Sequence, residues 1–272
     1  MSPHYPRLFL LILPAAIVFT AFFIIPMTRL IFIGGTGENG WTAYHAIFTN
    51  SRYLYSMIAT LILSFSVTII SVIISTIVGL FLVRNQFYGR DILISMLTFP
   101  LAFPGVVIGF LVILSAGRQG LIGYISKALT GDKWVFAYSI AGLFMGYVYF
   151  SIPRVILTVM AAGEKLEPSL EEAAKSLGAS PWQVVKDIII PALKPGLIAS
   201  SAICFATSMG AFGTAFTLAT NIDVLPMTIY TEFTLNANIA GAASLSIVLG
   251  LVTWLALYIA RSLSGTSVAP AG

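Results

Sequence analysis

Six long apolar runs divide this 272-residue chain and limit its possible folds more than any other feature. A helix that crosses about 30 Å of hydrocarbon needs about 20 apolar residues. The runs predict an all-α, polytopic membrane protein in one domain, residues 1–265, with a flexible tail at residues 266–272. The fifth run is too long for one perpendicular span, so we expect its start to lie at the cytoplasmic surface. The runs cover residues 8–33, 57–83, 92–114, 136–161, 188–219 and 240–260.

The composition supports a lipid environment and excludes several classes of protein. Hydrophobic residues make up 58% of the chain and charged residues 9%, whereas soluble domains carry about 25% charged residues. A cytosolic enzyme, a disordered chain and a DNA-binding domain are therefore excluded. The net charge of +4 comes from scattered Lys and Arg residues, and without a basic stripe it indicates no nucleic-acid partner.

Loop charges predict that both chain termini are cytoplasmic. In that orientation nine Lys and Arg residues lie inside and five outside, and positive residues favour the cytoplasmic side. We expect no charged residue at the centre of a span, where an ionisable group is the usual sign of an ion relay. This pattern disfavours an ion-coupled secondary transporter. The inside set is Arg7, Arg84, Arg90, Arg154, Lys165, Lys175, Lys186, Lys194 and Arg261.

The segment between the fourth and fifth runs, residues 163–191, predicts a pair of short helices. Pro168 suits the first position of a helix, because its missing N–H costs nothing there. Gly178 suits the left-handed residue that ends this helix. Ser180, Pro181 and Gln183 match the start of a second helix with a capping box.

The first of these helices is predicted to be amphipathic. Leu166, Leu170 and Leu177 recur at helical spacing, with alanines beside them. Packing on the lipid surface or on the protein's own bundle is one interpretation. A Lys- and Arg-rich polar face would favour lipid, but this face is acidic, which favours docking into a groove of another protein. Its acidic residues are Glu164, Glu167, Glu171 and Glu172.

The same segment resembles the EAA loop of binding-protein-dependent ABC import permeases. That family pattern is E-A-A-x3-G-x9-I-x-L-P, and this chain departs from it only at Ile190, which replaces Leu. The resemblance implies that the loop couples the spans to a cytoplasmic ATPase, with Glu172 at the contact and Gly178 as the bend. The candidate coupling residues are Leu170, Glu172, Ala173, Ala174, Leu177, Gly178 and Pro191.

The resemblance also implies the partners and the location of the protein. The expected partners are an ATPase dimer, a second permease that is identical or related, a soluble substrate-binding protein and the lipid bilayer of the inner (plasma) membrane. The chain contains no G-x4-G-K-[ST] phosphate loop. ATP and Mg²⁺ are therefore expected in the partner ATPase, with no cofactor in this chain. Nor does the sequence show a catalytic set or a metal site, because His4, His45 and Cys204 stand alone.

Two segments are candidates for a translocation path. Pro100 and Pro104 remove helix hydrogen bonds in the third run, which predicts either a packing kink or a gate. In the fifth run, small and hydroxyl residues either line a polar path with an apolar constriction or pack helices together. The candidate residues there are Ser208, Met209, Gly210, Phe212 and Thr214. In the following outer loop, Asp223 and Glu232 are either ordinary solvated charges or contacts for the binding protein.

The substrate is predicted by resemblance alone. The overall pattern is most similar to polyamine (spermidine/putrescine) permeases. Permeases for ferric iron, thiamine, phosphonate, and sulfate or molybdate share the same features, so these alternatives stay open. The spans carry no acidic residue that would itself favour a cationic cargo.

Overall fold

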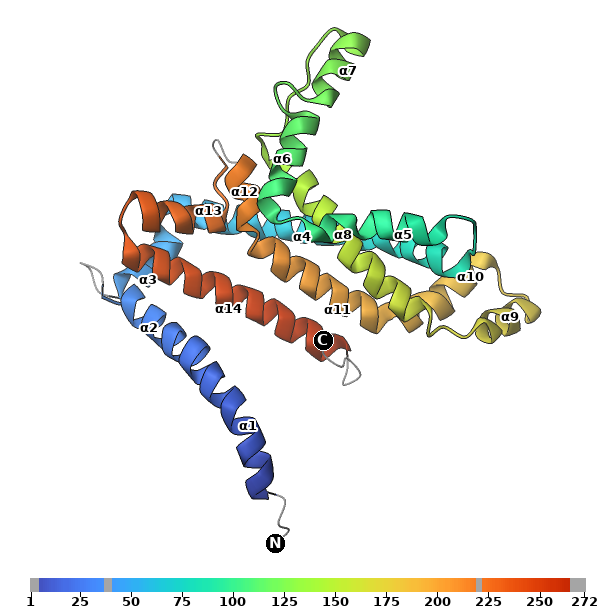
Figure 1. Ribbon diagram of the computed structural model, residues 1–272, viewed down its shortest axis with the longest axis horizontal. Helices are drawn as coiled ribbons and strands as arrows, with labels where there is room; N and C mark the ends of the chain where they lie inside the picture. Colours follow the sequence, from blue (N-terminus) through green and yellow to red (C-terminus); the bar gives the residue numbers. More distant parts are fainter. Residues whose placement is uncertain (1–4, 37–40, 219–221, 265–272) are drawn as a thin grey trace.

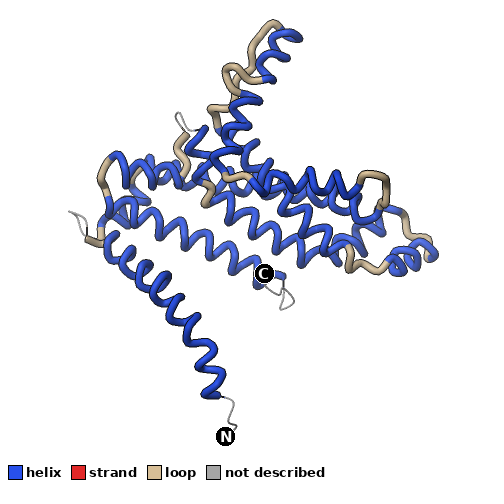
Figure 2. The backbone as a smooth tube through the Cα atoms, in the orientation of Figure 1, coloured by secondary structure: helices blue, strands red, loops and turns tan. Residues whose placement is uncertain are grey.

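The computed structural model describes residues 5–36, 41–218 and 222–264, and these residues form helices joined by loops, with no strand (Figure 2). Six helical stretches in this part are long and apolar enough to cross a membrane, as predicted. The predicted tail, residues 266–272, lies outside the described residues. The six stretches are Leu11–Gly34, Ser51–Arg84, Gly105–Thr130, Ile140–Gly163, Pro181–Met209 and Ile239–Leu263.

Four long helices run side by side and form the body of the molecule (Figure 1). The longest turns a stripe of serines, threonines and Gly79 toward its neighbours, and small residues let membrane helices approach closely. A Cβ atom added at Gly79 would lie 2.9 Å from Cγ1 of Val159 on the adjacent helix. The four helices are α4 (Ser51–Arg84), α8 (Ile140–Gly163), α11 (Ile190–Met209) and α14 (Ile239–Ser264).

The first span lies apart from this body. It consists of α1 (Tyr5–Phe19), a wide π turn at Thr20–Ile24, and α2 (Ile25–Gly34). The α2 end packs against α14, whereas α1 diverges from the bundle (Figure 1). No residue of its most apolar window is buried, so only lipid or another subunit can cover it.

The third run is not one span, as expected over residues 92–114, but two helices. A helix α5 (Arg90–Thr98) passes into a 3₁₀ turn at Phe99–Ala102, and α6 (Gly105–Ala116) begins after two extended residues. Pro100 and Pro104 lack the N–H groups that a continuous helix would need. The α5 helix lies along the bundle, while α6 and the following α7 (Leu121–Thr130) leave it at a steep angle (Figure 1).

The fifth run, which is too long for one perpendicular span, is also interrupted, at Gly210 and Ala211. After this break comes the short helix α12 (Phe212–Leu218). Several short helical elements pack around the end of the bundle where α4 begins (Figure 1). They are α3 (Thr42–Thr49), α13 (Leu225–Tyr230) and the π turn η4 (Thr231–Leu235).

Two further helices occupy the opposite end of the bundle. They are α9 (Pro168–Ser176) and α10 (Pro181–Val184). The second helix of the predicted pair does not stand alone, because a π turn at Val185–Ile189 joins α10 to α11 without a loop. The end of α2 and the start of α14 both lie near α3 (Figure 1). The start of α1 and the end of α14 therefore both lie away from α3.

Candidate functional site

The α9–α10 segment, residues 168–184, forms a sharp hook at one end of the bundle. Gly178 has a φ of +85°, the left-handed conformation predicted for it. The N–H of Ala179 donates to the carbonyl of Ala174 (3.0 Å), and the N–H of Gly178 donates to that of Lys175 (3.0 Å). This pair of bonds is the Schellman pattern that ends a helix, and it fixes the direction in which the chain leaves α9.

A capping box fixes the second arm of the hook. The N–H of Gln183 donates to Oγ of Ser180 (3.3 Å), and the N–H of Ser180 donates to Oε1 of Gln183 (2.7 Å). The predicted capping box is therefore confirmed. Both arms of the hook are therefore fixed by hydrogen bonds where they meet the turn.

One face of the hook packs on the protein's own bundle. Leu166 and Ala174 are half-buried against a cluster that includes Val184 and Leu193. Glu171 forms an ion pair with Arg84, at the end of α4. This face therefore packs on the protein's own bundle, which was one of the two interpretations of the amphipathic helix. Glu171 ties α9 to the end of α4.

Beside these packed residues, the hook has an exposed face that is largely apolar. The side chains of Leu170, Trp182 and Leu177 are 53%, 70% and 89% exposed. Glu172 and Ala173 are exposed beside them. Of the remaining predicted coupling residues, Pro191 is also exposed, away from the tip in the first turn of α11. The sequence interpretation missed Trp182, although its place directly after a capped Ser-Pro pair on a short helix is a usable signal.

Replacing Gly178 by Ala should loosen the tip of the hook. A left-handed conformation costs a residue with a Cβ atom about 1–2 kcal/mol. No atom lies within 4 Å of a Cβ atom added at Gly178, so the substitution introduces backbone strain and no steric clash. We expect the Ala179 amide to exchange its hydrogen about 5- to 30-fold faster. Gly178→Asn, which tolerates this conformation better, is the matched control. Equal exchange in the wild type and Gly178→Ala would contradict the role of the bend.

A second feature is a cavity of about 270 Å³ where the broken third run meets α8 and the end of α11. Pro100 and Gly105 line it on one side, Arg154 of α8 on another, and Thr207 and Thr214 on a third. Two predicted path residues, Pro100 and Thr214, therefore meet at one cavity. Thr214 is 1% exposed, and its hydroxyl donates to the carbonyl of Gly105 (2.9 Å), which is a helix-packing contact.

Arg154 corrects the expectation that no span carries a charge near its centre. It lies inside α8, about 21 Å from the start of the helix and about 14 Å from its end. It is therefore not a loop charge that sets orientation. An Arg at the centre of a lone membrane helix costs about 2.5–3.5 kcal/mol on insertion scales. Such a residue is retained where it faces a cavity or a partner, and here it faces the cavity.

The other predicted path residues do not share this cavity. Ser208 and Met209 are fully buried in the bundle, and the hydroxyl of Ser208 has no hydrogen-bond partner among the described residues. Gly210 is exposed at the break between α11 and α12. Phe212 packs its ring against Phe216 and Tyr230. The apolar constriction predicted for Met209 and Phe212 stays a prediction.

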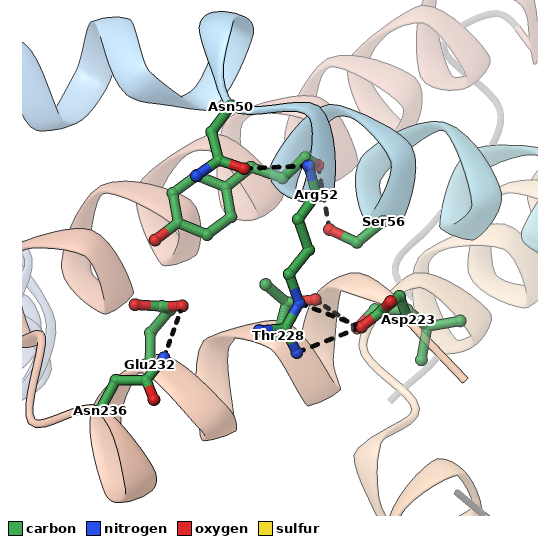
Figure 3. A network of polar contacts seen from close by, with 9 residues as sticks. Asn50, Arg52, Ser56, Asp223, Thr228, Glu232 and Asn236 are labelled. Atoms are coloured by element: carbon green, nitrogen blue, oxygen red, sulfur yellow. Dashed lines mark hydrogen bonds and ion pairs between the residues drawn. The ribbon is translucent and has the colours of Figure 1, made fainter. Parts of the chain in front are cut away.

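The far end of the bundle holds a polar network (Figure 3). Arg52 reaches Asp223 in an ion pair with a separation of 3.3 Å. Glu232 is only 5% exposed and accepts hydrogen bonds from Asn236 (3.0 Å) and Asn238 (2.8 Å). Glu232 is therefore not a solvated loop charge, as one interpretation held, but a buried acceptor that holds the η4 turn together.

At the same end, a side-chain hydrogen bond ties α3 to α2. The hydroxyl of Tyr44 donates to the carbonyl of Ile31 (2.9 Å). Burial raises the pKa of this hydroxyl, because the charged form would lose its water. Tyr44 therefore stays neutral and remains a donor across the physiological range of pH.

The described part of the chain is a bundle of helices long and apolar enough to span a membrane, with a hook at one end and a polar network at the other. A family model described as "Binding-protein-dependent transport system inner membrane component" matches residues 71–265. The chain belongs to this family and is a permease subunit of an ABC importer in an inner membrane. The orientation of its termini stays a prediction.

Known relatives and solved structures agree with this assignment. The chain is 33% identical to the molybdenum transport system permease protein ModB of Escherichia coli K12 over 219 residues, which cover 78% of this chain and 95% of that protein. It is 29% identical to the sulfate transport system permease protein CysT of the same organism over 199 residues, 73% of this chain and 70% of that protein. These relatives give the polyamine prediction no support.

The fold matches a solved transporter. A chain in the crystal structure of a bacterial alginate ABC transporter, in complex with alginate pentasaccharide-bound periplasmic protein, superposes with a TM-score of 0.81. The match covers 96% of both chains at 19% identity. At that identity it shows the fold alone, and it confirms the predicted six-span, all-α class.

Proposed function

We propose that this chain is the permease subunit of an importer for a tetrahedral oxyanion, molybdate or sulfate. The observation that carries the proposal is the 33% identity to a molybdenum permease over 95% of that protein's length. Sulfate permeases are the second group of relatives, and the two anions have the same shape and charge. The molybdenum and sulfate relatives described above do not favour ferric iron, thiamine, phosphonate or a polyamine as the substrate.

In this proposal the exposed face of the hook docks on a cytoplasmic ATPase. Leu170, Leu177 and Trp182 offer apolar surface next to Glu172, which suits insertion of a helix into a groove. ATP and Mg²⁺ bind to that partner. A second permease subunit covers α1, which its own chain leaves exposed, and a soluble binding protein delivers the anion at the far end.

Reconstitution tests the substrate. The permease, with its ATPase and binding protein, is placed in liposomes and offered radiolabelled molybdate, sulfate or spermidine. We expect ATP-dependent uptake of molybdate or sulfate and none of spermidine. An excess of the unlabelled second anion should compete if one path serves both. ATP-dependent uptake of spermidine without either anion would overturn the proposal.

A further inference from the structure

The Arg154 guanidinium is a partly buried cation without a counter-ion among the described residues. Its Nη1 atom is buried and has no hydrogen-bond partner among the described residues. Within the same residues Arg154 takes part in no ion pair. Buried charges are normally paired because desolvation is costly, so a structural role would require a partner that residues 5–36, 41–218 and 222–264 do not supply.

The cavity beside Arg154 has the right size and charge for a small anion. Its volume of about 270 Å³ is far above the ~10–15 Å³ that one water molecule needs. Of the described residues that line it, Arg154 alone is charged. Nothing acidic in that lining would neutralise the guanidinium.

The start of α6 adds to the positive character of the same cavity. Gly105, its first residue, lines the cavity, and no side chain caps this helix. The first N–H groups of a helix carry partial positive charge. The unpartnered guanidinium of Arg154 defines the site. The start of α6 adds positive charge to it.

We propose that Arg154 is the residue that selects anions during transport, by donating hydrogen bonds to the oxyanion as it passes this cavity. This inference rests on the proposed oxyanion import. A guanidinium presents a planar fork that matches two oxygens of one oxyanion and stays charged at every physiological pH. The same charge repels cations, so the site excludes a polyamine cargo.

The position of Arg154 also explains how the contact can be temporary. One wall of the cavity comes from the broken segment around Pro100, and another from the break after Met209. Both walls are points where a helix stops, so they can shift while α8 stays in the bundle. Arg154 holds the anion in the closed arrangement and releases it when these walls separate.

Charge substitutions at one position test the inference. Arg154→Met keeps much of the side chain's length and removes the charge, whereas Arg154→Lys keeps the charge. In liposomes with the ATPase and binding protein, we expect Arg154→Met to lower molybdate or sulfate uptake about 10-fold or more and Arg154→Lys to keep most of it. ATP hydrolysis stimulated by the binding protein should persist in both, which shows that they fold and assemble. Arg118→Gln, an exposed Arg outside the cavity, is the matched control.

The outcomes separate this inference from the proposed function. Wild-type uptake of either anion, with equal uptake by Arg154→Met, would overturn the role of Arg154 alone. Equal losses in Arg154→Met and Arg154→Lys, with assembly intact, would overturn it as well, because packing rather than charge would then matter. If the wild type hydrolyses ATP but takes up neither anion, the oxyanion assignment fails and this inference fails with it.

Discussion

Replacing Leu177 by Asp is expected to abolish copurification of the permease with its ATPase. Leu177 is 89% exposed at the tip of the hook, where it contributes nothing to the core of its own chain. Central apolar residues of an interface contribute about 2–4 kcal/mol each, which corresponds to about 30- to 1000-fold in affinity. A carboxylate in that contact also loses its water without gaining a partner. Affinity purification and ATP-dependent uptake both measure the effect.

The control for this prediction is Leu177→Met, which keeps the apolar surface and the helix. It should retain copurification and uptake at close to wild-type levels. If Leu177→Asp still purifies with the ATPase in normal yield, the exposed face of the hook is not the docking surface.

Replacing Gly109 by Val is expected to destabilise the permease and stop uptake. A Cβ atom at Gly109 would lie 2.5 Å from Cβ of Thr217, which is closer than two non-bonded carbon atoms can approach. The α6 and α12 helices must then separate, and overpacking of this kind costs about 1–3 kcal/mol. Because these helices form walls of the Arg154 cavity, the anion path changes too. Thermal unfolding in detergent and uptake in liposomes measure the two effects.

Gly250→Ala is the matched control for Gly109→Val. Gly250 also lies in a membrane helix, but no atom lies within 4 Å of an added Cβ. Ala has the higher helix propensity, so the thermal midpoint should stay the same or rise slightly. Wild-type stability and uptake in Gly109→Val would show that α6 and α12 do not depend on this close approach.

The sequence predicted features that depend on neighbouring residues. The six spans follow from run length, and the bend at Gly178 follows from the backbone freedom of glycine. The capping box at Ser180 and Gln183 needs only residues three apart. Each of these rules uses one local stretch of sequence, from a few residues for a cap to about 20 for a span, so a single chain without relatives is enough to apply it.

Features that depend on distant contacts were missed. Arg154 was counted as a loop charge because hydropathy does not show which helix positions face a cavity. That cavity exists only where the third and fifth runs both break. The prolines predicted a kink at Pro100 and Pro104, but not that α6 would leave the bundle. The Arg84–Glu171 pair joins residues 87 positions apart and has no local signal.

The unbroken join between the hook and α11 has a mechanical consequence. The stretch Pro181–Met209 contains 29 helical residues, a rod of about 43 Å at 1.5 Å per residue. Pivoting this rod by about 10° at its hooked end would swing its other end through about 7 Å. That other end borders the Arg154 cavity. If the ATPase docks on the hook as proposed, a modest rotation at the hook would therefore become a larger displacement at the cavity.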